Sequence, residues 1–422
     1  EIDAWRTRDA LKQLEEVIAP EIKTALEKTI TAEIDAAFDF AKSSPFPNTD
    51  DLGRYVYAKN RSANLPTPGT SSDRFVTYAE ALNEAQAYAL EHIDGVYLMG
   101  LGVPDPKGIF GSTLGLPERF GEGKVFDVPI SENALTGVAL GSAVTGQRPI
   151  LTHQRVDFTL VSIDQIVNQA AKWHYMFGGH MSAPMVIRMI IGRGWGQGPQ
   201  HSQALHAWFA HVPGLKVVMP ATAYDAKGML IAAVRDENPV VILEHRWLYG
   251  VKDAVPEAGY LVPLDKAMVR RAGTDITLIG ISYMTLECLR AAELLAECGI
   301  NAEVVDLRSV RPIDYATLLA SVEKTRLVLI ADHATSVAGV AGELSASINE
   351  KLFDTLLAAP VRVSLPDYPA PTSHAFAKGY YPNAHTIANA ALGALNKPTL
   401  NTEATEQRSA HDQPDATFTG PF

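Results

Sequence analysis

Glu132 is the residue of this sequence whose type and position most favour proton chemistry. It lies in a stretch over 125–164 that reads as a strand, a helix, a second strand and the beginning of another helix. Ser131 can cap the first of these helices, which places Glu132 in its opening turn. An acid at that position commonly stabilises the helix dipole, so spacing alone leaves open whether the carboxylate is structural or catalytic.

Further side chains that could do chemistry follow the second strand and a glycine-rich loop. His201 comes directly after that loop, and histidine is the side chain best suited to proton transfer near neutral pH. Gln154 and Phe158 follow the strand, where a lone phenylalanine is more often part of the core than a ligand contact. Arg155 could face a substrate carboxylate or form a salt bridge with Asp157, and we expect the salt bridge.

The elements that must position these residues alternate along the chain. From Arg74 onward, short apolar strands alternate with helices, which predicts an α/β fold with a parallel sheet covered on both faces. The same alternation resumes in a smaller unit after a second connection. We therefore expect a helical arm over 1–58, a linker over 59–72, a first α/β domain over 73–249, a linker over 250–266, a smaller α/β domain over 267–396 and a disordered tail over 397–422.

The composition disfavours several classes of function. A formal net charge of −12 argues against binding to nucleic acid or to an anionic membrane. The sequence contains no apolar run of membrane-spanning length. Its two cysteines, Cys288 and Cys298, match neither a disulfide framework nor a metal-site pattern, which favours a cytoplasmic location.

Several longer segments of the sequence resemble those of a known protein family. They are VPISENALTGVALGSAVTGQRPI and DFTLVSIDQIVNQAAK, followed in order by QHSQ, PGLKVV, NPVVILE and VDLRSVRPID. Over 73–396 the chain resembles the β subunit of the thiamine-diphosphate-dependent first component of 2-oxo acid dehydrogenase complexes, of the pyruvate or branched-chain type. The arm over 1–58 resembles the carboxyl-terminal tail of the α subunit of these enzymes. The resemblance implies a transketolase-like fold, with a pyrimidine-binding domain followed by a C-terminal domain.

The resemblance also implies roles for single residues. Glu132 would hydrogen-bond the pyrimidine ring nitrogen of thiamine diphosphate and so activate the cofactor. Gln154 and Phe158 would seat the pyrimidine, and His201 would assist the later acyl transfer. His206 and His211, on the helix that follows, are expected to be structural.

A structural potassium ion is a further implication of the resemblance. Its ligands would be the side chains of Asp236 and Asn238 and the carbonyl groups of Met185, Ala233 and Val234. An oxygen-only set with one carboxylate suits a monovalent cation. The alternative is an ordinary turn between a helix and a strand, because Asp-x-Asn-Pro favours a turn by itself.

Two departures from the family bear on the cofactor. Leu101 and Gly102 stand where the family usually has Glu and Asp, which removes a polar link near the cofactor. The Gly-Asp-Gly pattern with a downstream Asn, which binds Mg²⁺ and the diphosphate, does not occur in this sequence. In the family that pattern belongs to the α subunit. We therefore expect an α-like partner in an α2β2 assembly to complete the site.

The sequence thus predicts the β-like part of an enzyme that oxidatively decarboxylates a 2-oxo acid and transfers the acyl group to a lipoyl group on an acyltransferase. The polar residues over 153–157 and the missing acids leave a second hypothesis open, a carboligase or ketol transferase with the same cofactor. A third hypothesis is a scaffold that keeps the fold without turnover.

Overall fold

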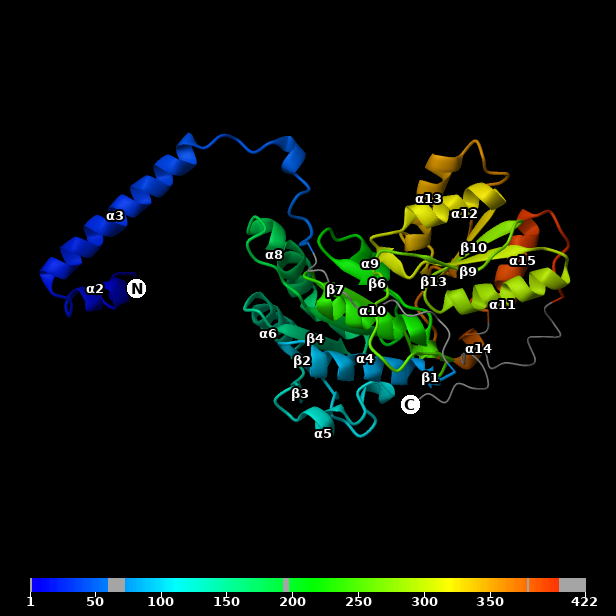
Figure 1. Cartoon of the computed structure of the whole chain (residues 1–422), viewed down its shortest axis with the longest axis horizontal. Helices are drawn as coiled ribbons and strands as arrows, with labels where there is room; N and C mark the ends of the chain where they lie inside the picture. Colours follow the sequence, from blue (N-terminus) through cyan, green and yellow to red (C-terminus); the bar gives the residue numbers. More distant parts are fainter. Residues whose placement is uncertain (1, 60–72, 193–196, 378, 402–422) are drawn as a thin grey trace. The chain divides into compact units, whose positions relative to one another are not determined.

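The computed structural model describes residues 2–59, 73–192, 197–377 and 379–401. The chain divides into two compact units, residues 1–54 and 55–422, and each is described by itself (Figure 1). Most of the predicted linker over 59–72 and of the predicted tail over 397–422 lies outside the described residues. No helix in the described ranges is long and apolar enough to cross a membrane.

The first unit is helical, as the spacing of its apolar residues predicts. It contains α1 (Ile2–Arg6), α2 (Ala10–Glu15), α3 (Pro20–Ser43) and the short 3-10 helix η1 (Thr49–Asp51). Pro20 occupies the first turn of α3, where its missing N–H costs no hydrogen bond. None of the residues in these helices is buried.

The larger unit contains a seven-stranded sheet in the order β12-β6-β7-β5-β4-β2-β3. Its strands are β2 (Val96–Gly100), β3 (Val125–Phe126), β4 (Arg148–His153), β5 (Val186–Ile191), β6 (Lys216–Val218), β7 (Val240–His245) and β12 (Ser309–Arg311). All pairs are parallel except β12 with β6. The carboxyl ends of the parallel strands therefore meet at one edge of the sheet.

Helices cover both faces of this sheet. Along β5, Val186 and Ile190 pack in the cluster that includes α4 and α10, whereas Ile187 and Met189 pack with α6 and α8. The helical segments are α4 (Tyr78–His92), η2 (Ile109–Gly111), α5 (Leu116–Phe120), α6 (Glu132–Val144), α7 (Val156–Thr159), η3 (Leu160–Ser162), the π-helix η4 (Gln165–Ala170), α8 (Ala171–Met176), α9 (His206–Ala210), α10 (Ala223–Arg235) and η5 (Arg246–Leu248). The alternation of side chains along each strand thus builds a three-layer α/β/α arrangement.

A second sheet of five strands follows in the order β14-β13-β10-β11-β9. Its strands are β9 (Met268–Arg271), β10 (Ile276–Gly280), β11 (Ala302–Asp306), β13 (Val328–Thr335) and β14 (Val361–Leu365). Its helices are α11 (Met284–Glu297), α12 (Tyr315–Thr325), α13 (Val340–Leu352), α14 (His374–Ala377) and α15 (Ala384–Ala394). Residues of α11 and α15 pack in one core cluster, and residues of α12 and α13 pack in the other.

Three details differ from the sequence predictions. The sequence over 160–177 predicts one continuous helix, whereas the structure has 3-10, π and α segments there. The expected linker over 250–266 contains β8 (Lys252–Ala254), which pairs antiparallel with β1 (Phe75–Thr77). The residues of β12 belong to the smaller domain in sequence, but β12 pairs with β6 of the larger sheet. Tertiary packing, and not position in the chain, determines which strands pair.

Candidate active site

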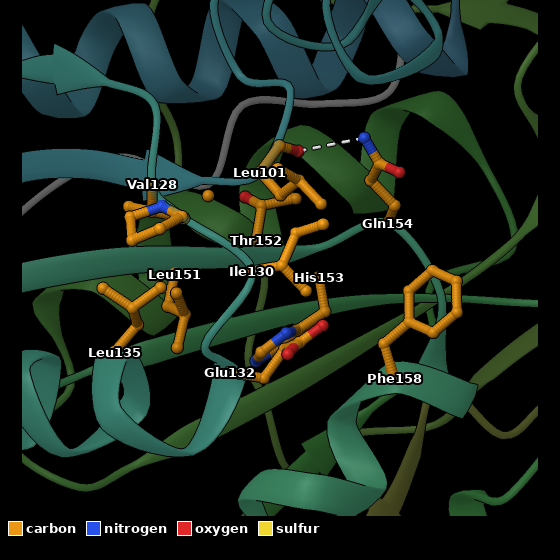
Figure 2. Close-up of a pocket in the computed structure, with 12 residues that line it drawn as sticks. Leu101, Val128, Ile130, Glu132, Leu135, Leu151, Thr152, His153, Gln154 and Phe158 are labelled. Carbon is orange, nitrogen blue, oxygen red and sulfur yellow. Dashed lines mark hydrogen bonds between the residues drawn. The ribbon is translucent and has the colours of Figure 1, made fainter.

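A pocket opens at the carboxyl edge of the seven-stranded sheet, where ligands of parallel α/β sheets commonly bind. Its empty space, including the part that is open to solvent, is about 360 Å³. The loop after β2, the segment between β3 and α6, the end of β4 and the short helix α7 all contribute to it (Figure 2). The lining residues are Gly100, Leu101, Val128, Pro129, Ile130, Glu132, Leu135, Leu151, Thr152, His153, Gln154 and Phe158.

Glu132 is the first residue of α6 and lines this pocket. The side chain of Ser131 forms no capping hydrogen bond, so the predicted serine cap is wrong. Within the described ranges, the only hydrogen bond at Glu132 outside the helix ladder goes to its backbone carbonyl, from the Thr136 hydroxyl at 2.7 Å. The carboxylate itself is therefore not held by the protein, as a structural capping acid would be, and is available to a ligand.

The other predicted cofactor residues gather around the same pocket. The side-chain amide of Gln154 donates to the Leu101 carbonyl at 3.0 Å, which ties the end of β4 to the loop after β2. Phe158, on α7, forms part of the pocket wall. The His201 ring meets the Phe158 ring edge to face, with centroids 5.3 Å apart. The structure thus brings together Glu132, Gln154, Phe158 and His201, although their roles remain predictions.

The loop that lacks the two family acids is held in another way. The backbone N–H of Gly102 donates to the Asp127 carboxylate at 2.9 Å. At Gly100, a Cβ atom would lie 2.4 Å from the Thr152 carbonyl oxygen, so the neighbouring strands require glycine there. Asp127 therefore anchors this loop through the backbone of Gly102.

Two polar residues of the pocket were not predicted as site residues. Thr152 and His153 end β4 and are almost fully buried. Thr152 Oγ1 and His153 Nε2 have no hydrogen-bond partner among the described residues. Burial lowers the pKa of His153 to about 4, so its imidazole is neutral near pH 7. The signal in the sequence was the polar pair at the end of an otherwise apolar strand.

The predicted salt bridge between Arg155 and Asp157 is wrong. The Arg155 guanidinium donates to the Gly192 carbonyl at 2.6 Å and also contacts the side chain of Gln197. The Asp157 carboxylate instead accepts from the side-chain amide of Gln203 at 2.8 Å. Arg155 and Asp157 have different partners because Arg155 precedes α7 in an extended conformation, whereas Asp157 lies within α7.

The residues expected to hold potassium form an internal ion-pair cluster. The Asp236 carboxylate accepts from the Lys216 ammonium at 2.5 Å and from the Asn238 side-chain amide at 2.7 Å. Arg148 donates to the carbonyls of Val234 and Asp236 at 2.9 and 3.1 Å. The Lys216 ammonium thus already pairs with the one carboxylate of the expected set, and the Arg148 guanidinium occupies the Val234 carbonyl, so this set does not fit a potassium ion.

The remaining expected ligands are also engaged. The carbonyl of Met185 accepts from the Val240 N–H at 2.9 Å, and that of Ala233 accepts from the Asp236 N–H at 3.2 Å. Among the described residues, no cluster of three or more His, Cys, Asp or Glu side chains could hold a metal ion.

His206 is buried, as expected of a structural histidine. Its Nε2 lies 3.1 Å from the Asp332 carboxylate of β13, so it links α9 to the five-stranded sheet. His211, at the end of α9, is exposed.

Comparison with known proteins defines the class. Residues 75–252 match the family "Transketolase, pyrimidine binding domain", and residues 265–387 match "Transketolase, C-terminal domain". A solved structure described as "Split gene transketolase, inactive beta4 tetramer" superposes with a TM-score of 0.61 at 23% identity, covering 76% of this chain and 98% of that chain. The chain is therefore a transketolase-like protein, and the pocket lies in its pyrimidine-binding domain.

Closer relatives identify the branch of that class. The chain is 38% identical over 340 residues to the acetoin:2,6-dichlorophenolindophenol oxidoreductase subunit beta of Bacillus subtilis, covering 78% of this chain and 99% of that protein. It is 39% identical to the mitochondrial pyruvate dehydrogenase E1 component subunit beta of Dictyostelium discoideum, covering 76% of this chain and 92% of that protein. The chain belongs to this family of E1 β subunits, the β-like parts of thiamine-diphosphate enzymes. These relatives do not favour the carboligase or ketol transferase hypothesis.

Proposed function

We propose that this chain is the pyrimidine-binding half of a heteromeric enzyme that oxidatively decarboxylates a 2-oxo acid and transfers the acyl group to a lipoyl group. The observation that carries the proposal is the pocket at the carboxyl edge of the sheet, which is lined by both the Phe158 ring and a Glu132 carboxylate without a hydrogen-bond partner in the described part of the protein. Bound thiamine diphosphate would supply the electron sink for the loss of carbon dioxide from the substrate.

The residues of this chain would orient the cofactor and hold protons. Glu132 would share a proton with the pyrimidine ring nitrogen, which the apolar wall around it favours. Phe158 would stack on the pyrimidine face, and Gln154 would fix the loop above it. His201, beside Phe158, would exchange a proton during acyl transfer.

An α-like partner is a necessary part of this proposal. Within the described residues, no acidic or histidine cluster could hold Mg²⁺, and the sequence lacks the family's diphosphate pattern. We infer that the partner holds Mg²⁺ and the diphosphate in an α2β2 assembly, which would act on a lipoyl-bearing acyltransferase. Cys288 and Cys298 are free thiols, which suits a reducing compartment such as the cytoplasm. Potassium is not part of the proposal.

The test begins with calorimetric titration of thiamine diphosphate and Mg²⁺ into this chain, alone and mixed with an α-like chain from the same source. We expect binding only in the mixture. Tight binding to this chain alone would contradict the shared site, and no binding in either sample would favour the scaffold hypothesis. The loaded mixture is then assayed for decarboxylation of 2-oxo acids and for reductive acylation of a lipoyl domain.

Glu132→Gln tests the catalytic assignment. We expect turnover to fall by about 100-fold or more, the scale of general acid–base catalysis, because the amide cannot share the proton. The melting temperature should stay within about 2 °C, since the carboxylate makes no hydrogen bond that the fold would lose. Glu118→Gln, an exposed acid on α5, is the matched control. Rates at the level of the unsubstituted protein in Glu132→Gln would refute the assignment.

A further inference from the structure

Two complementary polar groups line one pocket without hydrogen-bonding to each other in the unliganded chain. The Glu132 carboxylate projects from the start of α6, and the His153 imidazole projects from the end of β4. Figure 2 shows both side chains reaching into the pocket region from these two elements. His153 is only 6% exposed, and its Nε2 has no partner among the described residues.

The rest of the lining offers few alternatives to this pair. Most of it is apolar, and the side-chain amide of Gln154 is used by the Leu101 carbonyl. Leu101 and Gly102, which replace the family acids, bring no polar side chain. Of the side chains that line the pocket, Thr152 is the other one with a buried polar atom that lacks a partner. A ligand that closes the pocket would remove water from these buried polar groups, and each group without a hydrogen-bond partner would then cost free energy.

A carboxylate has two oxygens, and the proposed function uses one of them. That oxygen would face the pyrimidine ring nitrogen, while the other would be buried by the same ligand. A neutral imidazole offers one N–H, and a hydrogen bond from it to a carboxylate is a charge-assisted bond that gains strength in a dry site. Histidine can therefore replace water as the partner of the second oxygen when the pocket closes.

We propose that His153 is a positioning residue of this site, whose imidazole N–H donates to the Glu132 carboxylate oxygen that the cofactor leaves free. The inference rests on the proposed function, because it needs a ligand on the first oxygen. No proton leaves the imidazole. Its hydrogen bond fixes the carboxylate plane and keeps one oxygen directed at the ligand. In this chain a histidine on β4 thereby supplies a polar contact in a pocket from which two acids are missing.

The test uses the assembled enzyme, this chain with its α-like partner, and the probe thiamine diphosphate with Mg²⁺. His153→Leu should lose about 10- to 100-fold in cofactor affinity or in kcat, the scale of a charge-assisted hydrogen bond. His153→Gln and His153→Asn each keep one side-chain N–H, so at least one of them should recover a substantial part of the loss. Recovery distinguishes a hydrogen bond from a packing role. His92→Gln, an exposed histidine on α4, is the control.

A second readout does not depend on turnover. In histidine-¹⁵N-labelled protein, the ring N–H signal of His153, assigned by its absence in His153→Gln, should become protected from solvent exchange when the cofactor binds. In Glu132→Ala this protection should be lost. An unmoved His153 signal together with unchanged affinity and kcat in His153→Leu would overturn the inference, and so would a loss seen in Thr152→Val but not in His153→Leu. If the unsubstituted assembly binds no cofactor, the proposed function itself fails.

Discussion

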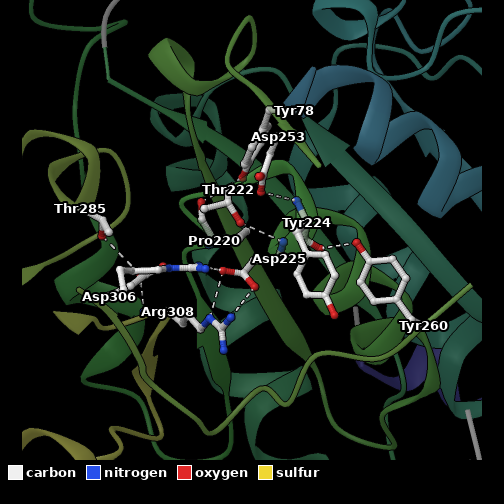
Figure 3. A network of polar contacts seen from close by, with 11 residues as sticks. Tyr78, Pro220, Thr222, Tyr224, Asp225, Asp253, Tyr260, Thr285, Asp306 and Arg308 are labelled. Carbon is white, nitrogen blue, oxygen red and sulfur yellow. Dashed lines mark hydrogen bonds and ion pairs between the residues drawn. The ribbon is translucent and has the colours of Figure 1, made fainter. Parts of the chain in front are cut away.

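The contact between the two α/β domains can be tested at Asp225. This fully buried carboxylate on α10 accepts from Nε and Nη2 of Arg308 at 3.0 and 2.6 Å (Figure 3). It also pairs with Arg270. Arg270 bridges to Asp306, which lies on β11 and is also fully buried. The four side chains form a neutral cluster of two acids and two arginines that joins the pyrimidine-binding domain to the C-terminal domain.

Asp225→Asn keeps the size of the side chain and removes one of the two negative charges. The buried Arg308 and the partly buried Arg270 then face the single carboxylate of Asp306, so the cluster carries an uncompensated positive charge. Breaking a buried pair by removing one partner costs about 3–5 kcal/mol. The backbone N–H of Asp225, which donates to the Thr222 hydroxyl at 3.1 Å, is unaffected, so helix capping should not contribute. We expect the unfolding free energy to fall by about 3–5 kcal/mol.

Urea unfolding of the full chain, followed by circular dichroism and by tryptophan fluorescence, measures this loss. The control is Asp275→Asn, because Asp275 lies outside the cluster and its carboxylate accepts from the exposed Asn301 N–H at 2.7 Å. The double variant Asp225→Asn with Arg308→Gln should be more stable than the sum of the two single losses indicates, since it restores neutrality. A loss below about 1 kcal/mol in Asp225→Asn, or strict additivity in the double variant, would refute the argument.

Two further expectations concern pH and a glycine. Burial lowers the pKa of His153 and of His333 to about 4 and that of His245 well below its ordinary value, so the folded chain excludes protons that the unfolded chain binds below about pH 6.5. As the pH is lowered from 6.5 to 4, the unfolding free energy should therefore fall by about 1.4 kcal/mol per pH unit for each of these histidines. His333→Gln should reduce the slope of the unfolding free energy against pH, and an unchanged slope would contradict this expectation. Gly214→Ala should cost at least about 2 kcal/mol in urea unfolding, because φ is +97° and the new Cβ would lie 1.8 Å from the Ala171 carbonyl oxygen. Gly299→Ala, with φ +74° but open space around it, should cost about 1 kcal/mol, and equal losses would show that the contact is unimportant.

Much of the architecture could be read from local pattern. Continuous apolar runs between helices are typical of buried parallel strands, and they predict strands over 96–101, 149–153 and 361–365. The strands β2, β4 and β14 lie within a residue or two of these bounds. The start of α10 was also expected, since Thr222 accepts from the Asp225 N–H. The pair Thr222 and Asp225 also predicts a reciprocal cap, in which the Asp225 carboxylate accepts from the Thr222 N–H. That half of the prediction is wrong, because the Asp225 carboxylate accepts from Arg308 of the other domain.

The sequence by itself determined the family, the alternation of elements and the residues Glu132, Gln154, Phe158 and His201, because these depend on periodicity and on ordered words along the chain. Only the tertiary structure decided what each polar group contacts. Strand ends far apart in sequence meet at one edge of a sheet, so the isolation of His153 and the placement of β12 in the larger sheet were not visible in one dimension. The engagement of Asp236 by Lys216 was hidden for the same reason: the balance of buried charges depends on distances across the fold, which local sequence does not encode.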